Sequence, residues 1–342
     1  MISILIPTIN RPEFIIRLLN YYHKVKCPYW LLIADSSDES RFSQTARRVT
    51  ELKNHLKIRH VHCSNETFGF SLGKLVNMVE TPYAVYTADD DFLVPNGLEV
   101  CADFLGHNFT YSSAHGYSIL FNLNCSGPYG EIQGVSRYCQ GSLENDLASH
   151  RLESYANNYF VNIFSLQRTE NWKKIAAVMP NIPEKSFAGE IYPCFMSIVQ
   201  GKVKELDCFY LVRQGHDRRY SLLSSYDWVL DPAWNPSYQI IYKELYQEIM
   251  KQDHQPLSEA QSFVKKVLWS YIMKGLELSK GPCGFEQIKI NVKNILQKNE
   301  LVFNLAKRTK NLISPSIELD LKWLLKQYKE DFKPIYQAVC SK

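Results

Sequence analysis

The sequence of 342 residues lacks the features of a membrane-spanning, disulfide-bonded or repetitive protein. No segment approaches 18 uninterrupted apolar residues, and the N-terminus reads as a strand instead of a charged start followed by a secretory apolar stretch. The nine cysteines include no CxxC pair, so reduced, mostly buried thiols are expected and disulfides or a zinc site are not. We therefore expect a cytoplasmic protein.

Strong charge is also missing, because the net charge is only +4. Residues 1–230 carry 22 Lys and Arg against 23 acids, whereas residues 231–342 carry 17 against 12. The basic residues are not clustered with an aromatic reading surface, which argues against nucleic-acid binding. The C-terminal excess suits an anionic lipid-linked acceptor or a peripheral membrane contact, and solvated helix faces explain it equally well.

What the sequence does contain is a run of three carboxylates, Asp89, Asp90 and Asp91, at the end of an apolar run that reads as a buried strand. Adjacent carboxylates repel one another, and a divalent cation with oxygen ligands is their usual compensation, often bridged to a phosphate-bearing substrate. A solvated acidic turn is the alternative. The run predicts a site for a metal ion and a nucleotide.

The first 105 residues alternate between strand and helix patterns. Strands are expected at 2–7, 30–34, 58–62 and 83–87, and helices at 12–24, 40–55 and 71–80. Such alternation predicts an α/β fold with a parallel sheet covered on both faces. Ligands bind beyond the carboxyl ends of the strands in these sheets, which is where Thr8, Asp35 and the acidic run fall.

Over residues 1–220 these motifs, in this order, resemble a family 2 glycosyltransferase of the GT-A fold. The opening Ile-Pro-Thr-Ile-Asn-Arg-Pro is similar to the family's nucleotide-binding strand and loop, and Ala-Asp-Ser-Ser at 34–37 is similar to its acidic turn beside the nucleobase. The segment 65–69, with the Lys and Asn that follow it, is similar to the segment whose basic side chain faces the nucleotide. The resemblance implies nucleotide contacts from Pro7, Thr8, Asn10, Arg11, Asp35, Lys74 and Asp89.

The acidic run departs from the family's common form, in which two acids flank one small residue and an apolar run then leads to proline. Counting back from Pro95 gives Ala88 the place of the first acid and Asp90 the place of the metal-binding acid. The bare pattern of acid, any residue, acid selects Asp89 and Asp91 instead. We expect Asp90 to be the main ligand of Mn²⁺ or Mg²⁺ and Asp89 to contact the ribose or the metal, and the resemblance leaves open whether Asp91 joins them.

An inverting sugar transfer also needs a base for the acceptor hydroxyl. Glu190 precedes an apolar helical run that ends at Gly201, which resembles the family's catalytic carboxylate at the start of a helix closed by glycine about three turns later. The usual partner acid is missing, because Ile191 follows. The structural alternative is a glutamate stabilised by the helix dipole, and both roles can hold together.

Further candidates follow the next apolar strand. His216 occupies the place of an additional metal ligand in many GT-A enzymes. Arg218 and Arg219 suit a diphosphate because guanidinium groups match phosphate oxygens, and a basic surface loop is the alternative. His60 and His62 share one face of their strand, which we interpret as packing because no further ligands cluster with them.

The chain is predicted to divide into a GT-A catalytic domain, 1–225, and a helical C-terminal region, 226–342, that packs against it. The catalytic domain has a nucleotide-binding half, 1–105, and an acceptor and catalytic half, 106–225. Residues 107–165 show few regular patterns, and their tyrosines suit stacking on sugars or ordinary packing. Helices of the C-terminal region are expected at 238–249, 263–272, 285–297 and 317–330.

Together these features predict a metal-dependent, inverting, hexosyltransferase-like glycosyltransferase of polysaccharide biosynthesis. Its donor is a nucleotide-sugar, with UDP the first choice because Asp35 can accept from the imide N–H of uracil, and its acceptor is a glycan or lipid-linked hydroxyl. Ala88 and Ile191 keep open a catalytically silent relative that binds nucleotide or glycan. A sugar nucleotidyltransferase is disfavoured because no Gly-rich, Arg-containing loop follows the first strand. The oligomeric state stays open.

Overall fold

The computed structural model describes residues 1–64, 66–216, 225–279 and 319–340. Two predictions fall outside these residues: the diphosphate contacts of Arg218 and Arg219, and the helix at 285–297. Within the described ranges, no helix is both long enough and apolar enough to cross a membrane.

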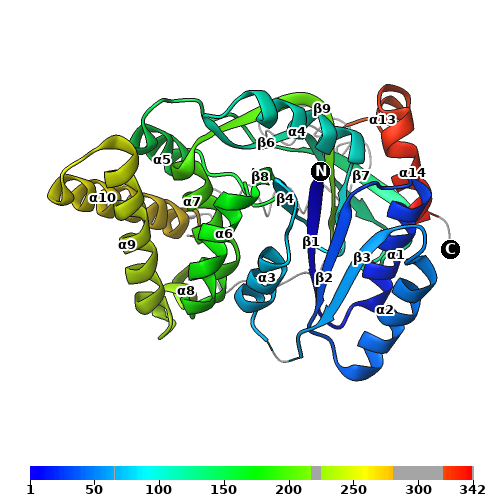
Figure 1. The fold of residues 1–342 in the computed structure, drawn as a ribbon. Coiled ribbons are helices and arrows are strands. Elements are labelled where there is room, and N and C mark those ends of the chain that lie inside the picture. Colours follow the sequence, from blue (N-terminus) through cyan, green and yellow to red (C-terminus); the bar gives the residue numbers. More distant parts are fainter. Residues whose placement is uncertain (65, 217–224, 280–318, 341–342) are drawn as a thin grey trace, which may run out of the picture.

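The N-terminal alternation of strands and helices is confirmed. The elements are β1 (Ile2–Thr8), α1 (Pro12–Lys24), β2 (Trp30–Asp35), α2 (Glu39–Leu52), β3 (Lys57–His62), α3 (Phe68–Asn77) and β4 (Tyr83–Tyr86). The four strands are parallel in the order β3-β2-β1-β4. Helices α1 and α2 cover one face of this part of the sheet and α3 covers the other (Figure 1).

Local chemistry sets several of these boundaries. Helix α3 begins three residues before its predicted start because the Thr67 hydroxyl accepts a hydrogen bond from the backbone of Phe70. Strand β1 continues through Pro7 to Thr8, one residue beyond the predicted end. Pairing with β4 already ends at Leu5, so the missing N–H of Pro7 breaks no bond to that strand.

The second half of the predicted GT-A domain extends the sheet. Its elements are β5 (Phe92–Leu93), α4 (Pro95–His107), β6 (Tyr111–Leu123), β7 (Ile132–Tyr138), α5 (Ala148–Asn157), β8 (Leu166–Arg168), α6 (Thr169–Val178), a 3₁₀ turn η1 (Met179–Asn181), a π-helical turn η2 (Phe187–Ile191), α7 (Tyr192–Gln200) and β9 (Lys202–Gly215). The sheet order is β3-β2-β1-β4-β8-β6-β9-β5, with β7 paired to β6 and β8 antiparallel to its neighbours. Residues 107–165, where the sequence shows few regular patterns, contain β6, β7 and α5.

The C-terminal region is helical, as predicted. It comprises α8 (Ser225–Leu230), α9 (Trp234–Asp253), α10 (Leu257–Ser279), α13 (Leu321–Gln327) and α14 (Lys329–Cys340). Helices α9 and α10 pack against α5, and α9 also packs against α7, whereas α14 packs against α1 at the other end of the molecule (Figure 1). The helix expected at 317–330 is broken at Tyr328, which separates α13 from α14.

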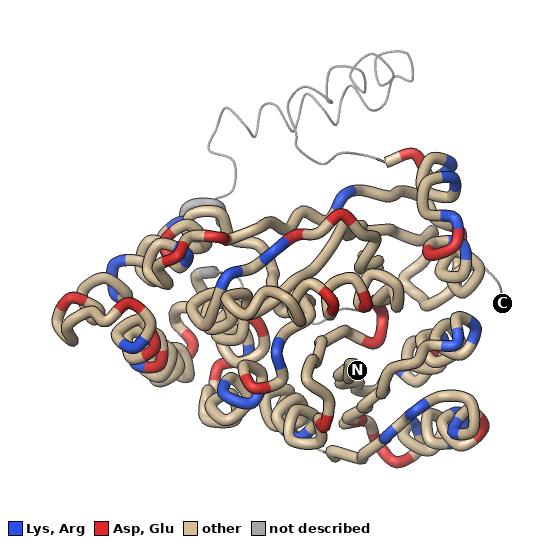
Figure 2. Tube along the Cα trace, turned by 45° about the horizontal axis from the view of Figure 1, so that its top comes forward, with Lys and Arg blue, Asp and Glu red and all other residues tan. Residues whose placement is uncertain are grey.

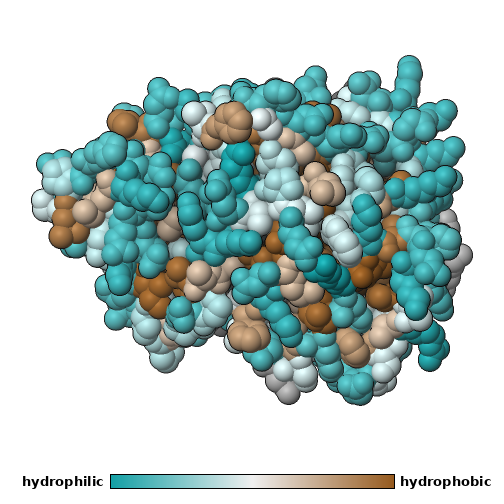
Figure 3. All heavy atoms as spheres, viewed as in Figure 1, coloured by the Kyte–Doolittle hydropathy of each residue, from teal (hydrophilic) through white to brown (hydrophobic). Residues whose placement is uncertain are grey.

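The surface carries charges of both signs. Figure 2 shows basic and acidic residues interspersed along the described helices and strands, and the face in Figure 3 is mostly hydrophilic with small separate apolar groups. Residues 280–318, which are not described, hold seven Lys or Arg against three acids, so most of the C-terminal basic excess lies there. The described cysteines are all free, and Cys27, Cys63, Cys101 and Cys194 are buried.

Candidate active site

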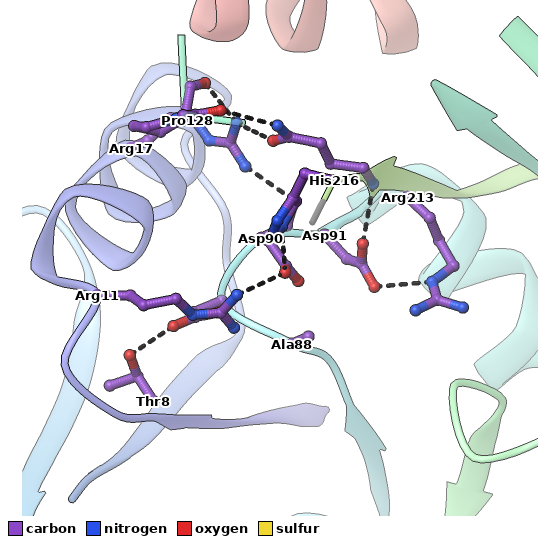
Figure 4. Close-up of polar contacts among 12 residues, drawn as sticks. Thr8, Arg11, Arg17, Ala88, Asp90, Asp91, Pro128, Arg213 and His216 are labelled. Carbon is purple, nitrogen blue, oxygen red and sulfur yellow. Dashed lines mark hydrogen bonds and ion pairs between the residues drawn. The ribbon is translucent and has the colours of Figure 1, made fainter. Parts of the chain in front are cut away.

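The acidic run forms a loop after β4, at the carboxyl edge of the parallel strands, and its carboxylates have different partners, as Figure 4 shows for Asp90 and Asp91. Asp89 accepts a hydrogen bond of 2.6 Å from the Thr8 hydroxyl and forms an ion pair with Arg11. The Asp90 carboxylate lies 2.9 Å from Nε2 of His216 and also 2.9 Å from Nη1 of Arg11. The fold therefore brings together four of the predicted donor-site residues and His216.

Asp91 faces away from this group and towards β9. Its Oδ2 accepts a 2.9 Å hydrogen bond from Nε of Arg213, and its Oδ1 accepts a 3.0 Å bond from the backbone N–H of Gln214. Arg213 also donates to the Tyr138 hydroxyl at 2.9 Å. Burial raises the pKa of Tyr138 to about 12, against the opposing effect of Arg213, and the negative charge of Glu190 acts in the same direction as burial. The acidic loop is thus connected through Arg213 and Tyr138 to the vicinity of the candidate base.

Arg17 is a site residue that the sequence analysis missed. It lies on the buried face of α1 and donates to the backbone oxygen of Asp90 at 2.8 Å and to Oε1 of Gln214 at 2.6 Å. Burial lowers its pKa to about 10, against the effect of the three carboxylates. The signal was present, because an arginine on an otherwise apolar helix stripe with Phe14 and Leu18 indicates a buried partner.

The three acids are balanced by three guanidinium groups, those of Arg11, Arg17 and Arg213. The repulsion that the sequence predicted is therefore met by arginines within the protein. Asp89 and Asp91 have no exposed surface, whereas the side chain of Asp90 is 8% exposed and that of Arg11 is 19% exposed. Asp90 is the only one of the three acids with exposed surface, and Arg11, which bonds it, is partly exposed, as is Arg213 on the Asp91 side of the loop.

The pKa values of Asp89 and Asp90 shift in opposite directions. Burial raises the pKa of Asp89 to about 7 although Arg11 opposes this. For Asp90 burial also acts upward, but the hydrogen bond from His216 and the charge of Arg11 outweigh it and lower the pKa to about 2. The ionised form is therefore most strongly favoured at Asp90.

Asp90 and His216 could offer a divalent cation one carboxylate and one imidazole nitrogen, and the cation itself stays a prediction. Mn²⁺ and Mg²⁺ prefer oxygen ligands, and Mg²⁺ is commonly held by one or two carboxylates together with substrate phosphates, so Asp90 is the better matched of the two groups. The His216 side chain has no exposed surface, and its Nε2 faces Asp90. Among the described residues, no group of three or more His, Cys, Asp or Glu side chains is arranged to hold a metal by itself. Both oxygens of Asp91 already accept hydrogen bonds from β9.

The predicted nucleobase turn lies at the ends of β2 and β3. Asp35 has no exposed surface, because the N–H of Ser37 and the ring of His60 contact its two oxygens at 3.0 and 3.2 Å. Burial acts to raise the pKa of Asp35, but these hydrogen bonds hold it below its ordinary value. The rings of His60 and His62 both stack on Phe42, at 4.7 and 4.1 Å between centroids. In this conformation Asp35 holds the turn together, and its contact with a base stays a prediction.

Three other predicted contacts border this turn. Asn10, with a positive φ of 54°, accepts from the N–H of Asp38 at 3.1 Å. Lys74 is exposed on α3, and its Nζ lies 3.5 Å from the backbone oxygen of His62. Pro7 pairs in register with Ala34 of β2. Asn10 and Lys74 therefore present the exposed polar groups on this side.

Glu190 lies within η2, which runs directly into α7. The helical run predicted after Glu190 is confirmed, because α7 follows η2 and ends at Gly201. The carboxylate that caps the start of η2 is that of Glu184, which accepts from the backbone N–H groups of Ser186 and Phe187 at 3.0 and 2.8 Å. Glu190 itself accepts a 2.9 Å hydrogen bond from the Tyr159 hydroxyl and lines a cavity. The helix-capping explanation therefore applies to Glu184, and π-helical turns such as η2 are frequent at functional sites.

No family model and no curated protein sequence matches the chain. Solved structures do match: Staphylococcus aureus TarS 1–349 in complex with UDP-GlcNAc aligns over 80% of this chain and 72% of its own, at 16% identity and a TM-score of 0.50. The fold is GT-A. A second TarS structure aligns over 78% of this chain at a TM-score of 0.49, and there the chain spans only 42% of its length. At these identities the likeness shows the GT-A fold alone, as the sequence predicted.

Proposed function

We propose that this GT-A protein is a family 2-like inverting glycosyltransferase that moves a sugar from a nucleoside-diphosphate donor to a hydroxyl of a glycan or lipid-linked acceptor. The observation that carries the proposal is the pairing of a reachable, ionised Asp90 with Arg11 and His216 at the carboxyl edge of the sheet. UDP is the preferred donor nucleotide, because the neighbour of the same fold, the glycosyltransferase TarS, is solved with UDP-GlcNAc.

On the donor side, Asp90 and His216 would hold Mn²⁺ or Mg²⁺, which supplies charge stabilisation for the departing diphosphate. Arg11 is the reachable guanidinium beside them and matches phosphate oxygens in shape and charge. Thr8 fixes Asp89 from β1, which keeps that carboxylate on the Arg11 side of the loop. The divalent cation and Arg11 would together neutralise the negative charge that grows on the diphosphate as the sugar leaves.

On the acceptor side, Glu190 would act as the general base. The acceptor hydroxyl transfers its proton to the Glu190 carboxylate while its oxygen forms a bond to the anomeric carbon and the bond to the diphosphate breaks. The Tyr159 hydroxyl donates to one oxygen of Glu190, so the other oxygen is left to accept the proton. A single displacement by one base inverts the configuration and needs no nucleophile from the protein.

Donor binding is tested by thermal unfolding with UDP, GDP, CDP, dTDP and CMP, each with and without Mn²⁺. A ligand that binds the folded state raises the midpoint by mass action. We expect UDP with Mn²⁺ to stabilise the wild type and the control Asp103→Ala, which removes an exposed acid from α4, and not to stabilise Asp90→Ala. The absence of a response to every nucleotide would refute the donor site.

Catalysis is tested separately by UDP release with Glu190→Gln. This variant should keep the nucleotide-induced rise in the midpoint and lose about 10² to 10⁴ in turnover, the usual contribution of a positioned base. Nucleotide binding without metal-dependent turnover in the wild type would instead identify a catalytically silent relative.

A further inference from the structure

The cavity beside Glu190 has a volume of about 470 Å³, which lies within the range of about 300–1,000 Å³ typical of small-molecule sites. It opens between the C-terminal end of α5, the turn η2 and the helices α8 and α10. Glu190 and Ser186 lie on the wall formed by the catalytic domain, and residues 271–276 of α10 form the wall that faces them. The C-terminal helical region is therefore part of the candidate active site.

Three aromatic side chains line this cavity: Tyr159, Trp228 and Tyr271. The ring of Tyr271 packs 5.1 Å from that of Tyr159 and 5.1 Å from that of Phe195, measured between centroids, which fixes it against the catalytic domain. Aromatic faces provide flat apolar surface for the C–H face of a sugar ring. Tyr159 therefore has two contacts here: its hydroxyl donates to Glu190, and its side chain lines the same cavity as Glu190.

Polar groups lie at the edge of the same cavity. Asn157 and Asn158 supply amides, Ser186 supplies a hydroxyl, and Lys274 donates to the backbone oxygen of Asn157. None of the described residues that line the cavity is an arginine, whereas the donor side has Arg11. This composition suits a ring with many hydroxyls and one apolar face, and it does not suit a diphosphate.

We propose that this cavity binds a pyranose ring of the acceptor and that α10 completes it through Tyr271. This inference rests on the proposed function, because it gives the hydroxyl that Glu190 would deprotonate its place in the structure. It also gives the C-terminal helices a role in selecting the acceptor.

The chain offers a variant that blocks the cavity directly. A Cβ built at Gly275, which lines the cavity on α10, meets no atom within 4 Å, so a side chain can start there without a clash at its Cβ. Gly275→Phe should fill the space, whereas Gly275→Ala adds one methyl group and removes a helix-destabilising glycine. Tyr271→Leu keeps apolar bulk but removes the aromatic face. Trp269→Ala is the matched control, because Trp269 lies on the same helix but lines a separate cavity of about 340 Å³ between α9 and α10.

The probes are methyl β-glycosides of glucose, galactose and N-acetylglucosamine, measured by saturation-transfer NMR on the full chain with UDP and Mn²⁺ present. At least one glycoside should bind the wild type, Gly275→Ala and Trp269→Ala. Binding should be about tenfold weaker in Tyr271→Leu and undetectable in Gly275→Phe. The rise in the unfolding midpoint with UDP should be the same in all five proteins.

The outcomes separate the two proposals. Three outcomes would overturn the assignment of this cavity. The glycosides could bind Gly275→Phe as tightly as the wild type, they could bind none of the five proteins, or their binding could be lost only in Trp269→Ala. A normal UDP response beside such a result leaves the transferase proposal intact. Loss of the UDP response in the wild type refutes the transferase proposal instead, whatever the glycosides do.

Discussion

His115 of β6 provides a quantitative test of how α7, the helix that follows the candidate base, is anchored. Its ring is fully buried, and Nδ1 lies 3.0 Å from the Ser165 hydroxyl, which itself donates to Asn162. Since that hydroxyl proton is directed to Asn162, its oxygen accepts from Nδ1–H of His115. The Asn162 amide then donates to the hydroxyl of Ser197 in α7, the helix that follows Glu190. The network therefore requires a proton on Nδ1. Nε2 is buried and has no hydrogen-bond partner among the described residues, so a second proton there would be an unpaired buried charge, and the imidazole is neutral.

Burial lowers the pKa of His115 to about 3. In the unfolded chain an imidazole has a pKa of about 6.5, so as the pH falls from 7 to 5 the unfolded state gains nearly one proton that the folded state does not. The stabilising effect of this neutral histidine is fully present above pH 6.5 and is lost as the pH falls towards 3. Between pH 7 and pH 5 the free energy of unfolding should decrease by about 2 kcal/mol from this group alone.

The measurement is urea denaturation of the wild type, His115→Gln and His150→Gln at pH 7, 6 and 5. His115→Gln removes the titrating group and should lose about 2 kcal/mol less than the wild type over this interval, because the other groups titrate alike in both proteins. His150 is exposed on α5, and its replacement should leave the wild-type pH dependence. Equal losses in the wild type and His115→Gln would refute the neutral buried imidazole.

Two further predictions concern the support of the acidic loop. Gly97→Ala on α4 would place a Cβ 2.2 Å from the backbone oxygen of Phe209, so chemical denaturation should show a loss of about 1–3 kcal/mol or more in the free energy of unfolding. Gly106→Ala on the same helix is the control and should be neutral or stabilising, because the nearest atom to its Cβ lies at 3.7 Å. Arg213→Met leaves the Asp91 carboxylate buried without its partner and should lower the free energy of unfolding by about 3–5 kcal/mol. Adding Asp91→Asn to this variant should recover most of that loss. A double variant no more stable than Arg213→Met would contradict the pairing.

The N-terminal half of the fold could be predicted because its strands are continuous apolar runs between recognisable helices. Strand β6 could not, although its 13 residues make it one of the longest in the sheet. It contains Ser, His and Gly at buried positions, residues that strand propensity disfavours or leaves neutral. Those residues are tolerated because tertiary partners, such as Ser165 for His115, satisfy them. Gly116 has a further reason, since a Cβ there would lie 2.3 Å from the backbone oxygen of Cys208 on β9.

The candidate site was predicted only in part, because some of its contacts join residues that lie far apart in the sequence. Thr8, Arg11, Asp90 and His216 were identified from motifs at strand ends, and the sheet brings them together. The partners of Asp91 were not predicted, because Arg213 lies 122 positions away and only the pairing of β5 with β9 makes them neighbours. A contact of that kind depends on sheet topology, which the local pattern of a single sequence does not fix.

The three consecutive acids therefore have three different roles. Asp89 is bound to β1 through Thr8 and Asp91 to β9 through Arg213, so the backbone on both sides of Asp90 is fixed by buried contacts. Asp90, the one member with any exposed surface, is held in position before any ligand arrives, and preorganisation of this kind lowers the reorganisation needed when charge develops on a substrate. Because Arg213 also bonds Tyr138, a single arginine of β9 connects the acidic loop to β7.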